Sequence, residues 1–215
     1  MHKKDIKIKK IKKSIGSALL LSGMLLLLTG CSHVTSEMKE SKANGIALME
    51  SGDYEGAVEA FDSLIDQTKR VSSFEIDVLK YRGEAEFMLG DYGAAAYTYD
   101  TLAKVDKPRA EYYYLGAVSL ANSGDVDGAG NRLESGKNAD AKHEASGYAE
   151  AMEALGAAYM TAGDETKADE IYQTLVDEGF SSTEVYNRWM MAAMEKGSYE
   201  EALEHAETGL SLSDE

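Results

Sequence analysis

The sequence predicts an all-α fold. Its 215 residues include one proline, 20 glycines and ten methionines, a composition that favours closely crossing helices over a β-sandwich, which needs more turns. A short phrase built on Gly-Asp also recurs along the chain, as in "SGDYEGAVEAF" and "LGDYGAAAYTY". The hydrophobic fraction of 44% allows a sizeable core and excludes a wholly disordered chain.

The net charge of -16 is unevenly distributed. Residues 1–30 carry seven Lys and one Asp, so the remainder holds 15 Lys and Arg against 37 Asp and Glu. An acidic body argues against nucleic acid as a partner, because phosphate binding depends on Lys and Arg. We interpret the acidity as a source of solubility, with a basic partner or substrate as the alternative.

The first thirty residues have the layout of a secretory signal. "MHKKDIKIKKIKK" is polybasic, and "SIGSALLLSGMLLLLTG" follows as an apolar run that ends in small residues. The alternative is a membrane-spanning anchor, but the run at 14–30 has 17 residues, short of the ~20 that cross a bilayer. We therefore predict that residues 1–30 are a signal peptide.

The segment "LLTGC" at 27–31 resembles the lipobox of bacterial lipoproteins. The resemblance implies cleavage before Cys31 and attachment of lipid to its thiol, with two or three acyl chains that anchor stably. Cys31 is the single cysteine, which excludes an intramolecular disulfide or a CxxC site. Residues 31–37 then form the lipidated end and a polar tether. The plainer alternative is a free cysteine after a signal peptide.

Aligned on the Gly-Asp pairs, residues 38–215 fall into five copies. They begin near Met38, Ile76, Ala110, Ala149 and Thr183. A period near 34 residues resembles the tetratricopeptide repeat (TPR), a helix-turn-helix unit. The resemblance implies one domain over 38–215 that is a right-handed α-solenoid of about five repeats.

Three columns of this alignment predict how the two helices of each repeat pack. Small residues recur at the eighth and twentieth positions, which we expect to face each other and to set the helix crossing. Large residues at the twenty-fourth position fill the space that the small ones open. The eighth position is Gly45, Gly83, Ala117 and Gly156, the twentieth is Ala57, Ala95, Ala129, Ala168 and Ala202, and the twenty-fourth is Phe61, Tyr99, Leu133 and Tyr172. The fifth copy departs from this pattern, with Met190 at its eighth position and Ala206 at its twenty-fourth.

The Gly-Asp pair itself predicts a turn within each repeat. We expect the glycine to end the first helix in a left-handed conformation and the next residue to cap the second helix. The glycines are Gly52, Gly90, Gly124, Gly163 and Gly197, followed by Asp53, Asp91, Asp125, Asp164 and Ser198.

The sequence shows no signature of an enzyme. The glycine phrase lacks the Lys and Ser/Thr of a phosphate loop, and the histidines form no HExxH or clustered ligand set. We therefore predict no catalytic residue, cofactor or metal. His143 and His205 are interpreted as solvated helix residues. Trp189 is interpreted as a core residue, with ligand stacking as the alternative.

In the TPR family the first helices line a concave groove, and contacts come from the second, fifth, ninth, twelfth and thirteenth positions of each repeat. The resemblance thus implies a groove that binds an extended peptide or a helix. The residues expected there are Lys42, Lys80, Phe87, Tyr114, Glu150, Glu153, Met160, Glu184, Asn187 and Met194.

Within this set, Tyr114, Met160 and Met194 are expected to give apolar contact, and the three glutamates to pair with basic groups. In "EYYYLG" we expect Tyr113 to pack inside and Tyr112 or Tyr114 to be wetter. The alternative for the methionines is packing between repeats.

These features predict a protein-interaction scaffold or adaptor at the bacterial cell envelope, lipid-anchored on the extracytoplasmic face of the cell membrane. Its partner is another envelope protein or peptide. The alternative is a self-associating structural envelope protein without a peptide ligand. Its contact would be an apolar edge of the last helix formed by Leu203, Leu210 and Leu212.

Overall fold

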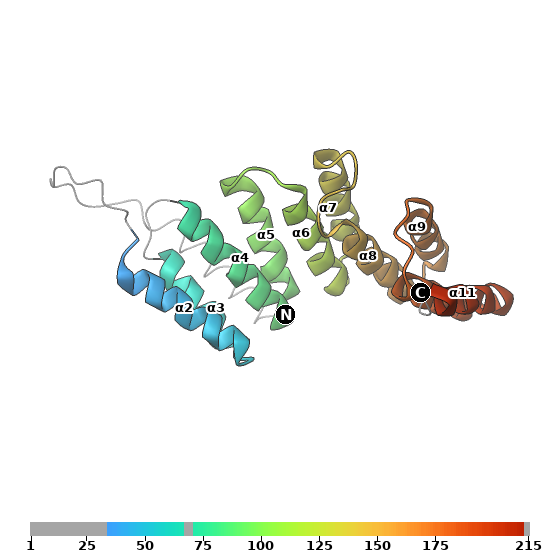
Figure 1. Ribbon diagram of the computed structural model, residues 1–215, viewed down its shortest axis with the longest axis horizontal. Coiled ribbons are helices and arrows are strands. Elements are labelled where there is room, and N and C mark those ends of the chain that lie inside the picture. The colour runs from blue at the N-terminus through green and yellow to red at the C-terminus, as the bar shows by residue number, and fades with distance from the viewer. Residues whose placement is uncertain (1–33, 67–70, 213–215) are drawn as a thin grey trace. The chain divides into compact units, whose positions relative to one another are not determined.

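A computed structural model describes residues 34–66 and 71–212, which form ten α-helices and no strand (Figure 1). The predicted signal peptide, Cys31 and the start of the tether lie outside the described residues. Among the described helices, none is long and apolar enough to cross a membrane. The helices are α2 (Ser36–Glu50), α3 (Tyr54–Asp66), α4 (Ser73–Met88), α5 (Tyr92–Val105), α6 (Ala110–Asn122), α7 (Val126–Ala139), α8 (Tyr148–Ala162), α9 (Glu165–Asp177), α10 (Thr183–Lys196) and α11 (Tyr199–Leu212).

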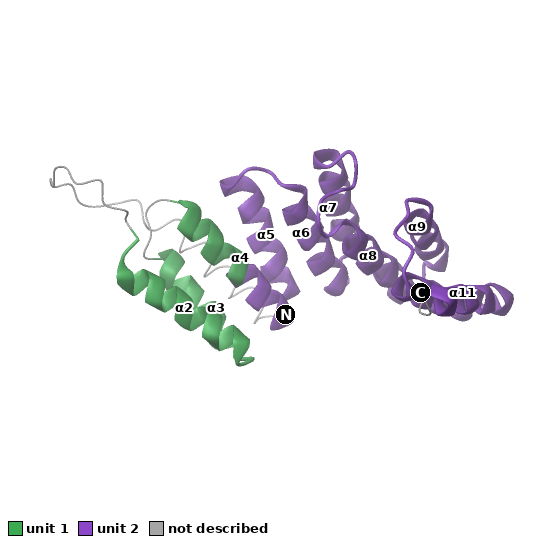
Figure 2. Cartoon of the chain, in the orientation of Figure 1, with its two compact units in different colours: residues 1–81 green, residues 82–215 purple. Residues whose placement is uncertain are grey.

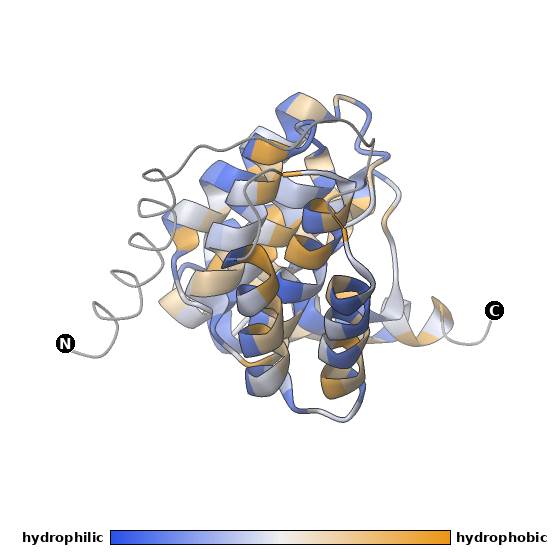
Figure 3. Cartoon of the chain, turned by 90° about the vertical axis from the view of Figure 1, so that its left-hand side faces the viewer, coloured by the Kyte–Doolittle hydropathy of each residue, from blue (hydrophilic) through white to orange (hydrophobic). Residues whose placement is uncertain are grey.

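The helices follow one another as five helix-turn-helix pairs, so the all-α fold of the solenoid class is confirmed. Each first helix begins within three residues of a predicted repeat start. The chain divides into two compact units, and the boundary falls between Tyr81 and Arg82, inside α4 (Figure 2). In the first unit α2 packs on α3; in the second, α6 packs on α5, α7 and α8, and α10 packs on α9 and α11. The helices carry both hydrophilic and hydrophobic residues (Figure 3), as expected of amphipathic helices.

The turn within each repeat has the predicted conformation. All five turn glycines have φ between 78° and 84°. Residues that carry a Cβ are strained in this left-handed region, whereas glycine is not. In four copies the aspartate side chain accepts a hydrogen bond from the backbone N–H three residues later. The N to Oδ1 distances are 3.0 Å at Asp53, 3.3 Å at Asp91, 2.9 Å at Asp125 and 3.2 Å at Asp164. The conformation of the turn is therefore determined by the glycine, the aspartate and the backbone N–H three residues after the aspartate.

The small columns are buried, and three of their glycines lie against an aromatic ring. A Cβ on Gly45 would lie 2.6 Å from the Phe61 ring, and one on Gly156 would lie 2.8 Å from the Tyr172 ring. Gly83 has the same relation to Tyr99, at 3.0 Å. The nearest neighbour of each glycine is thus the large twenty-fourth residue. The glycine lets that ring lie directly on the backbone of the first helix.

In the fifth repeat the eighth position is large and the twenty-fourth is small, the reverse of the other repeats. Its eighth position is Met190 and its twenty-fourth is Ala206, and both are half-buried. The large side chain has moved from the second helix of the pair to the first. We therefore expect the volume between these two helices to be filled by a side chain of the first helix instead of the second.

A buried ion pair lies in the second unit. The Arg82 guanidinium is 3.0 Å from the Glu86 carboxylate, with 8% and 3% of the two side chains exposed. Thr98 connects both: its hydroxyl accepts from Arg82 and donates to Glu86, each at 2.6 Å. These contacts satisfy charges that would otherwise be costly to bury.

Both histidines interpreted as solvated are packed on aromatic rings, so that interpretation is wrong. His205 stacks on Trp189 with ring centroids 4.0 Å apart, and His143 stacks on Tyr148 at 4.3 Å. Trp189 is 8% exposed, as expected of a core residue. Its Nε1 donates to the Asp169 carboxylate at 2.5 Å. In each case the neighbouring aromatic ring covers one face of the imidazole and shields that face from water.

His205 makes stability depend on pH. Burial lowers the pKa of His205 below its ordinary 6.5, although Asp169, Glu204 and Glu201 oppose the shift. Because the folded pKa lies below the unfolded one, the stability that the neutral ring contributes is complete above 6.5 and is lost as the pH falls from there through the lower folded pKa. We expect the urea midpoint to fall more between pH 7.5 and pH 5 in the natural protein than in His205→Gln. Equal falls would contradict this prediction.

Candidate functional site

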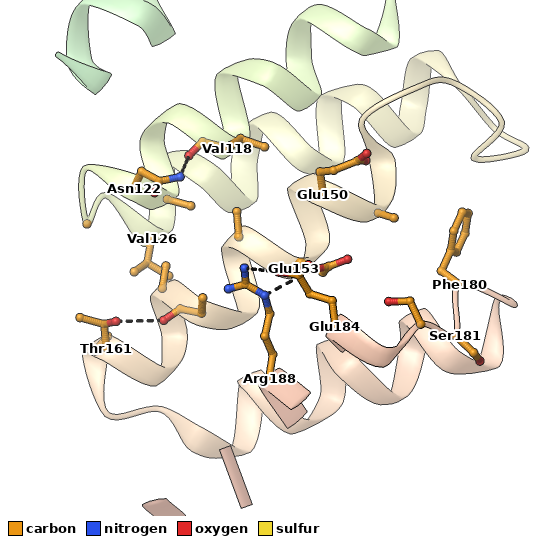
Figure 4. Close-up of a pocket in the computed structure, with 18 residues that line it drawn as sticks. Val118, Asn122, Val126, Glu150, Glu153, Thr161, Phe180, Ser181, Glu184 and Arg188 are labelled. Atoms are coloured by element: carbon orange, nitrogen blue, oxygen red, sulfur yellow. Dashed lines mark hydrogen bonds and ion pairs between the residues drawn. The ribbon is translucent and has the colours of Figure 1, made fainter. Parts of the chain in front are cut away.

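A groove of about 1040 Å³ lies in the second unit. It is lined by the first helices α6, α8 and α10 and by the loop that precedes α10 (Figure 4). One part of its lining is apolar and made of short side chains, including Val118, Ala121, Ala154 and Ala157. The other part carries four charged residues, which are Glu150, Glu153, Glu184 and Arg188.

The hollow results from the alanines of α8. Ala154, Ala157 and Ala158 lie where this helix faces the groove, and alanine combines the highest helix propensity with little volume. The segment "EALGAAYMTA" thus builds a stable helix that leaves space beside it. The groove can therefore take the side chains of an extended segment or a helix.

Arg188 joins two of the helices at the charged part of the groove. Its Nη2 is 2.9 Å from Glu184 Oε1 on its own helix, and its Nε is 3.4 Å from Glu153 Oε2 on α8. Three carboxylates against one guanidinium leave the groove acidic. Burial raises the pKa of Glu153, an effect that Arg188 opposes. A cation that entered the groove would oppose the rise of that pKa, as Arg188 does.

The loop before α10 closes one end of the groove and is held by Tyr148. The Phe180 ring meets the Tyr148 ring edge-on at 5.4 Å. The Tyr148 hydroxyl donates to Glu178 Oε2 at 2.6 Å, and the His143 Nδ1 lies 3.1 Å from the same oxygen. Burial and this carboxylate raise the pKa of Tyr148 well above its usual range. These contacts fix Phe180, which lines the groove together with Ser181 (Figure 4).

Of the ten predicted groove residues, the structure brings together Glu150, Glu153 and Glu184. Arg188 was not predicted, although its spacing of four from Glu184 on a helix was a visible signal. The residues at the ninth and thirteenth positions were also not named, although the repeat rule covers them. They are Val118, Asn122, Ala157 and Thr161.

The placement of Tyr114 in the groove is wrong. Tyr114 is 0% exposed and meets the Tyr148 ring at 5.6 Å. Tyr112 is also buried and Tyr113 is half-buried, so the expected order of the three tyrosines is wrong as well. The reason is Gly136, where a Cβ would lie 2.3 Å from the Tyr114 ring. This glycine opens a space in α7 that draws Tyr114 inward.

The other predicted residues lie outside this groove. In the second unit, Phe87 and Met160 are half-buried, and Asn187 and Met194 are exposed. Met160 packs against the core cluster of that unit.

In the first unit Lys80 is exposed, whereas Lys42 forms an ion pair with Asp77 and lies 5.1 Å from the Tyr81 ring centroid. Whether any of the residues outside the groove contacts a partner stays a prediction. Across the described helices and loops, no group of three His, Cys, Asp or Glu is arranged to hold a metal ion.

Residues 42–104 match the tetratricopeptide repeat family model. These residues span most of the first two of the five helix pairs. No curated protein matches the chain. The match confirms the repeat type over this part of the chain.

Solved structures match over most of the chain. MamA 41-end from Desulfovibrio magneticus RS-1 is 20% identical, with a TM-score of 0.65 over 84% of this chain and 97% of that one. The TPR-like repeats of a Podosopora anserina kinesin light chain are 18% identical, with a TM-score of 0.65 over 84% and 97%. Another MamA crystal structure has a TM-score of 0.62 at 20% identity, over 79% and 94%. At these identities the likeness establishes the TPR fold.

Proposed function

We propose that this protein is a non-enzymatic TPR scaffold or adaptor that binds an extended peptide or a helix of another protein. The observation that carries the proposal is the groove along α6, α8 and α10, because it joins an apolar wall of alanines to three carboxylates. Such a groove offers apolar anchoring and selects for a partner with basic groups. Glu150, Glu153 and Glu184 have the role of pairing with those groups.

We further propose that the scaffold is a lipoprotein at the bacterial cell envelope. The support is in the sequence, where a basic and apolar leader ends in "LLTGC". Lipid on Cys31 anchors the chain to the extracytoplasmic face of the membrane. The partner is then another envelope protein or a peptide segment of one.

The groove can be tested by photocrosslinking in the native cell. A photoreactive residue replaces Ala157 in the full chain, and the captured proteins are identified. Glu150→Lys, Glu153→Lys and Glu184→Lys together are expected to abolish capture, because they repel basic groups. The matched control reverses Glu134, Glu144 and Glu170, which are exposed and outside the groove. Captured proteins that are the same in both variants would refute the groove assignment.

The anchor is tested with Cys31→Ser in the same cells. After signal cleavage this variant is expected to leave the membrane fraction. If it still fractionated with membranes, the lipid anchor would be refuted and the groove would stay a separate question.

A further inference from the structure

The outer side of α11 carries exposed apolar side chains in a single row. Tyr199, Leu203 and Leu210 are 72%, 61% and 66% exposed. Their spacings of four and seven residues place all three on one side of a helix. Such spacing is that of a helix seam that packs against another helix. We call these three residues the α11 stripe.

The repeat alignment shows what covers this surface in an inner repeat. Leu203 and Leu210 occupy the twenty-first and twenty-eighth positions of the fifth repeat. In the second repeat these positions are Ala96 and Ala103, which are 6% and 9% exposed. They belong to α5, which packs against α6, the first helix of the next repeat. The α11 stripe is thus the surface on which a repeat receives the following helix.

In the fourth repeat, too, the residue at the twenty-first position contacts the first helix of the next repeat, and here that residue is polar. Asp169 occupies the twenty-first position there, and its carboxylate accepts from Trp189 and Lys196 of α10 at 2.5 Å and 2.8 Å. The twenty-first position therefore contacts the first helix of the next repeat in a second case. The α11 stripe is separate from the groove, because no residue that lines the groove belongs to α11.

Charge selects the kind of helix that fits the stripe. The α11 sequence "YEEALEHAETGLSL" has four glutamates and no Lys or Arg. Glu200 and Glu207 are seven residues apart, so they flank the stripe on the same side. A second copy of α11 would set these carboxylates against like charges, which is unfavourable. A helix with Lys or Arg beside its apolar row would instead meet opposite charges.

We propose that the α11 stripe binds an amphipathic helix of another protein, with an apolar row flanked by Lys or Arg. The bound helix packs on α11 in the way that α6 packs on α5. Its apolar row covers Leu203 and Leu210, and its basic side chains pair with Glu200 and Glu207. The protein then has two binding surfaces, the groove and the α11 stripe. At the stripe, the partner helix packs lengthwise against α11 through its apolar row.

Two synthetic peptides of about 20 residues serve as probes. Both carry leucines at spacings of four and three residues; one has Lys at the flanking positions and the other has Glu. Fluorescence anisotropy measures their binding to the full chain in nanodiscs of phosphatidylcholine, with empty nanodiscs as the blank. We expect the Lys peptide to bind about tenfold more tightly than the Glu peptide, because opposite charges face it across the interface.

Two sets of variants test the apolar row and the charges separately. Leu203→Glu with Leu210→Glu is expected to weaken the Lys peptide about tenfold or more, whereas Leu115→Glu, an exposed leucine of α6, leaves binding unchanged. Glu200→Lys with Glu207→Lys is expected to reverse the preference between the peptides. All these side chains are exposed, so folding is retained.

Two results would overturn the proposal. One is a peptide preference that the Glu200 and Glu207 changes do not alter, because the charges would then have no role. The other is a natural protein that sediments as a dimer and becomes a monomer with Leu210→Glu. In that case a second copy would be the occupant of the stripe.

Discussion

Replacing Glu86 with leucine is expected to lower the free energy of unfolding by about 3–5 kcal/mol. The change leaves the Arg82 guanidinium, with 8% of its side chain exposed, without the carboxylate 3.0 Å away. It also removes the acceptor of the Thr98 hydroxyl. The loss exceeds that of an ordinary surface pair, because a buried charge cannot recover its hydration. Urea unfolding followed by circular dichroism measures it.

Two further variants identify the cause of this loss. Glu84→Leu, an exposed neighbour on the same helix, is expected to change stability by less than about 0.5 kcal/mol. Arg82→Met combined with Glu86→Leu is expected to cost less than the sum of the two single changes, because the two residues share one contact and the guanidinium that loses this carboxylate is removed as well. Additive losses in the double variant would show that the two residues act independently.

Tyr172→Ala is expected to lower the free energy of unfolding by about 3–5 kcal/mol, the usual range for truncating a buried aromatic residue. Tyr172 is 1% exposed, and its ring lies against the backbone at Gly156. Truncation therefore leaves a cavity between α8 and α9. The same urea titration measures the effect.

The fifth repeat indicates how this loss can be reduced. Its Met190 and Ala206 stand where the fourth repeat has Gly156 and Tyr172. Adding Gly156→Met to Tyr172→Ala reproduces that order and fills the cavity from α8. We expect the double variant to be at least about 1 kcal/mol more stable than Tyr172→Ala. Gly156→Met alone is the control, and it is expected to destabilise because its side chain meets the Tyr172 ring. A double variant no more stable than Tyr172→Ala would refute the idea that a large side chain at the eighth position can replace one at the twenty-fourth.

Much of the fold was predictable because its signals are local. Gly90 and Asp91, for example, fix a helix end and a helix start through contacts within a few residues. The recurrence of that pair then places every other residue in a column. The three groove glutamates came from the same columns, since positions on first helices repeat at a fixed spacing.

The errors arose where a residue depends on an irregular neighbour. Tyr114 is buried because Gly136, on the next helix, leaves space for its ring. The column pattern assigns no meaning to a glycine at that position. His143 follows an insertion between repeats and packs on Tyr148, a contact that no repeat rule contains. Arg188 was missed because its role depends on Glu153 of another helix as well as on Glu184.

The position of Arg188 has a consequence for any cationic partner. Its guanidinium is tethered to the groove and already meets Glu153 and Glu184. A tethered group acts at a high effective concentration, of the order of millimolar for short linkages. It is therefore an internal competitor for the positive charge of a ligand. Under the proposed function, we expect the groove to favour a ligand that joins its positive charge to apolar contacts along α8 over a small cation.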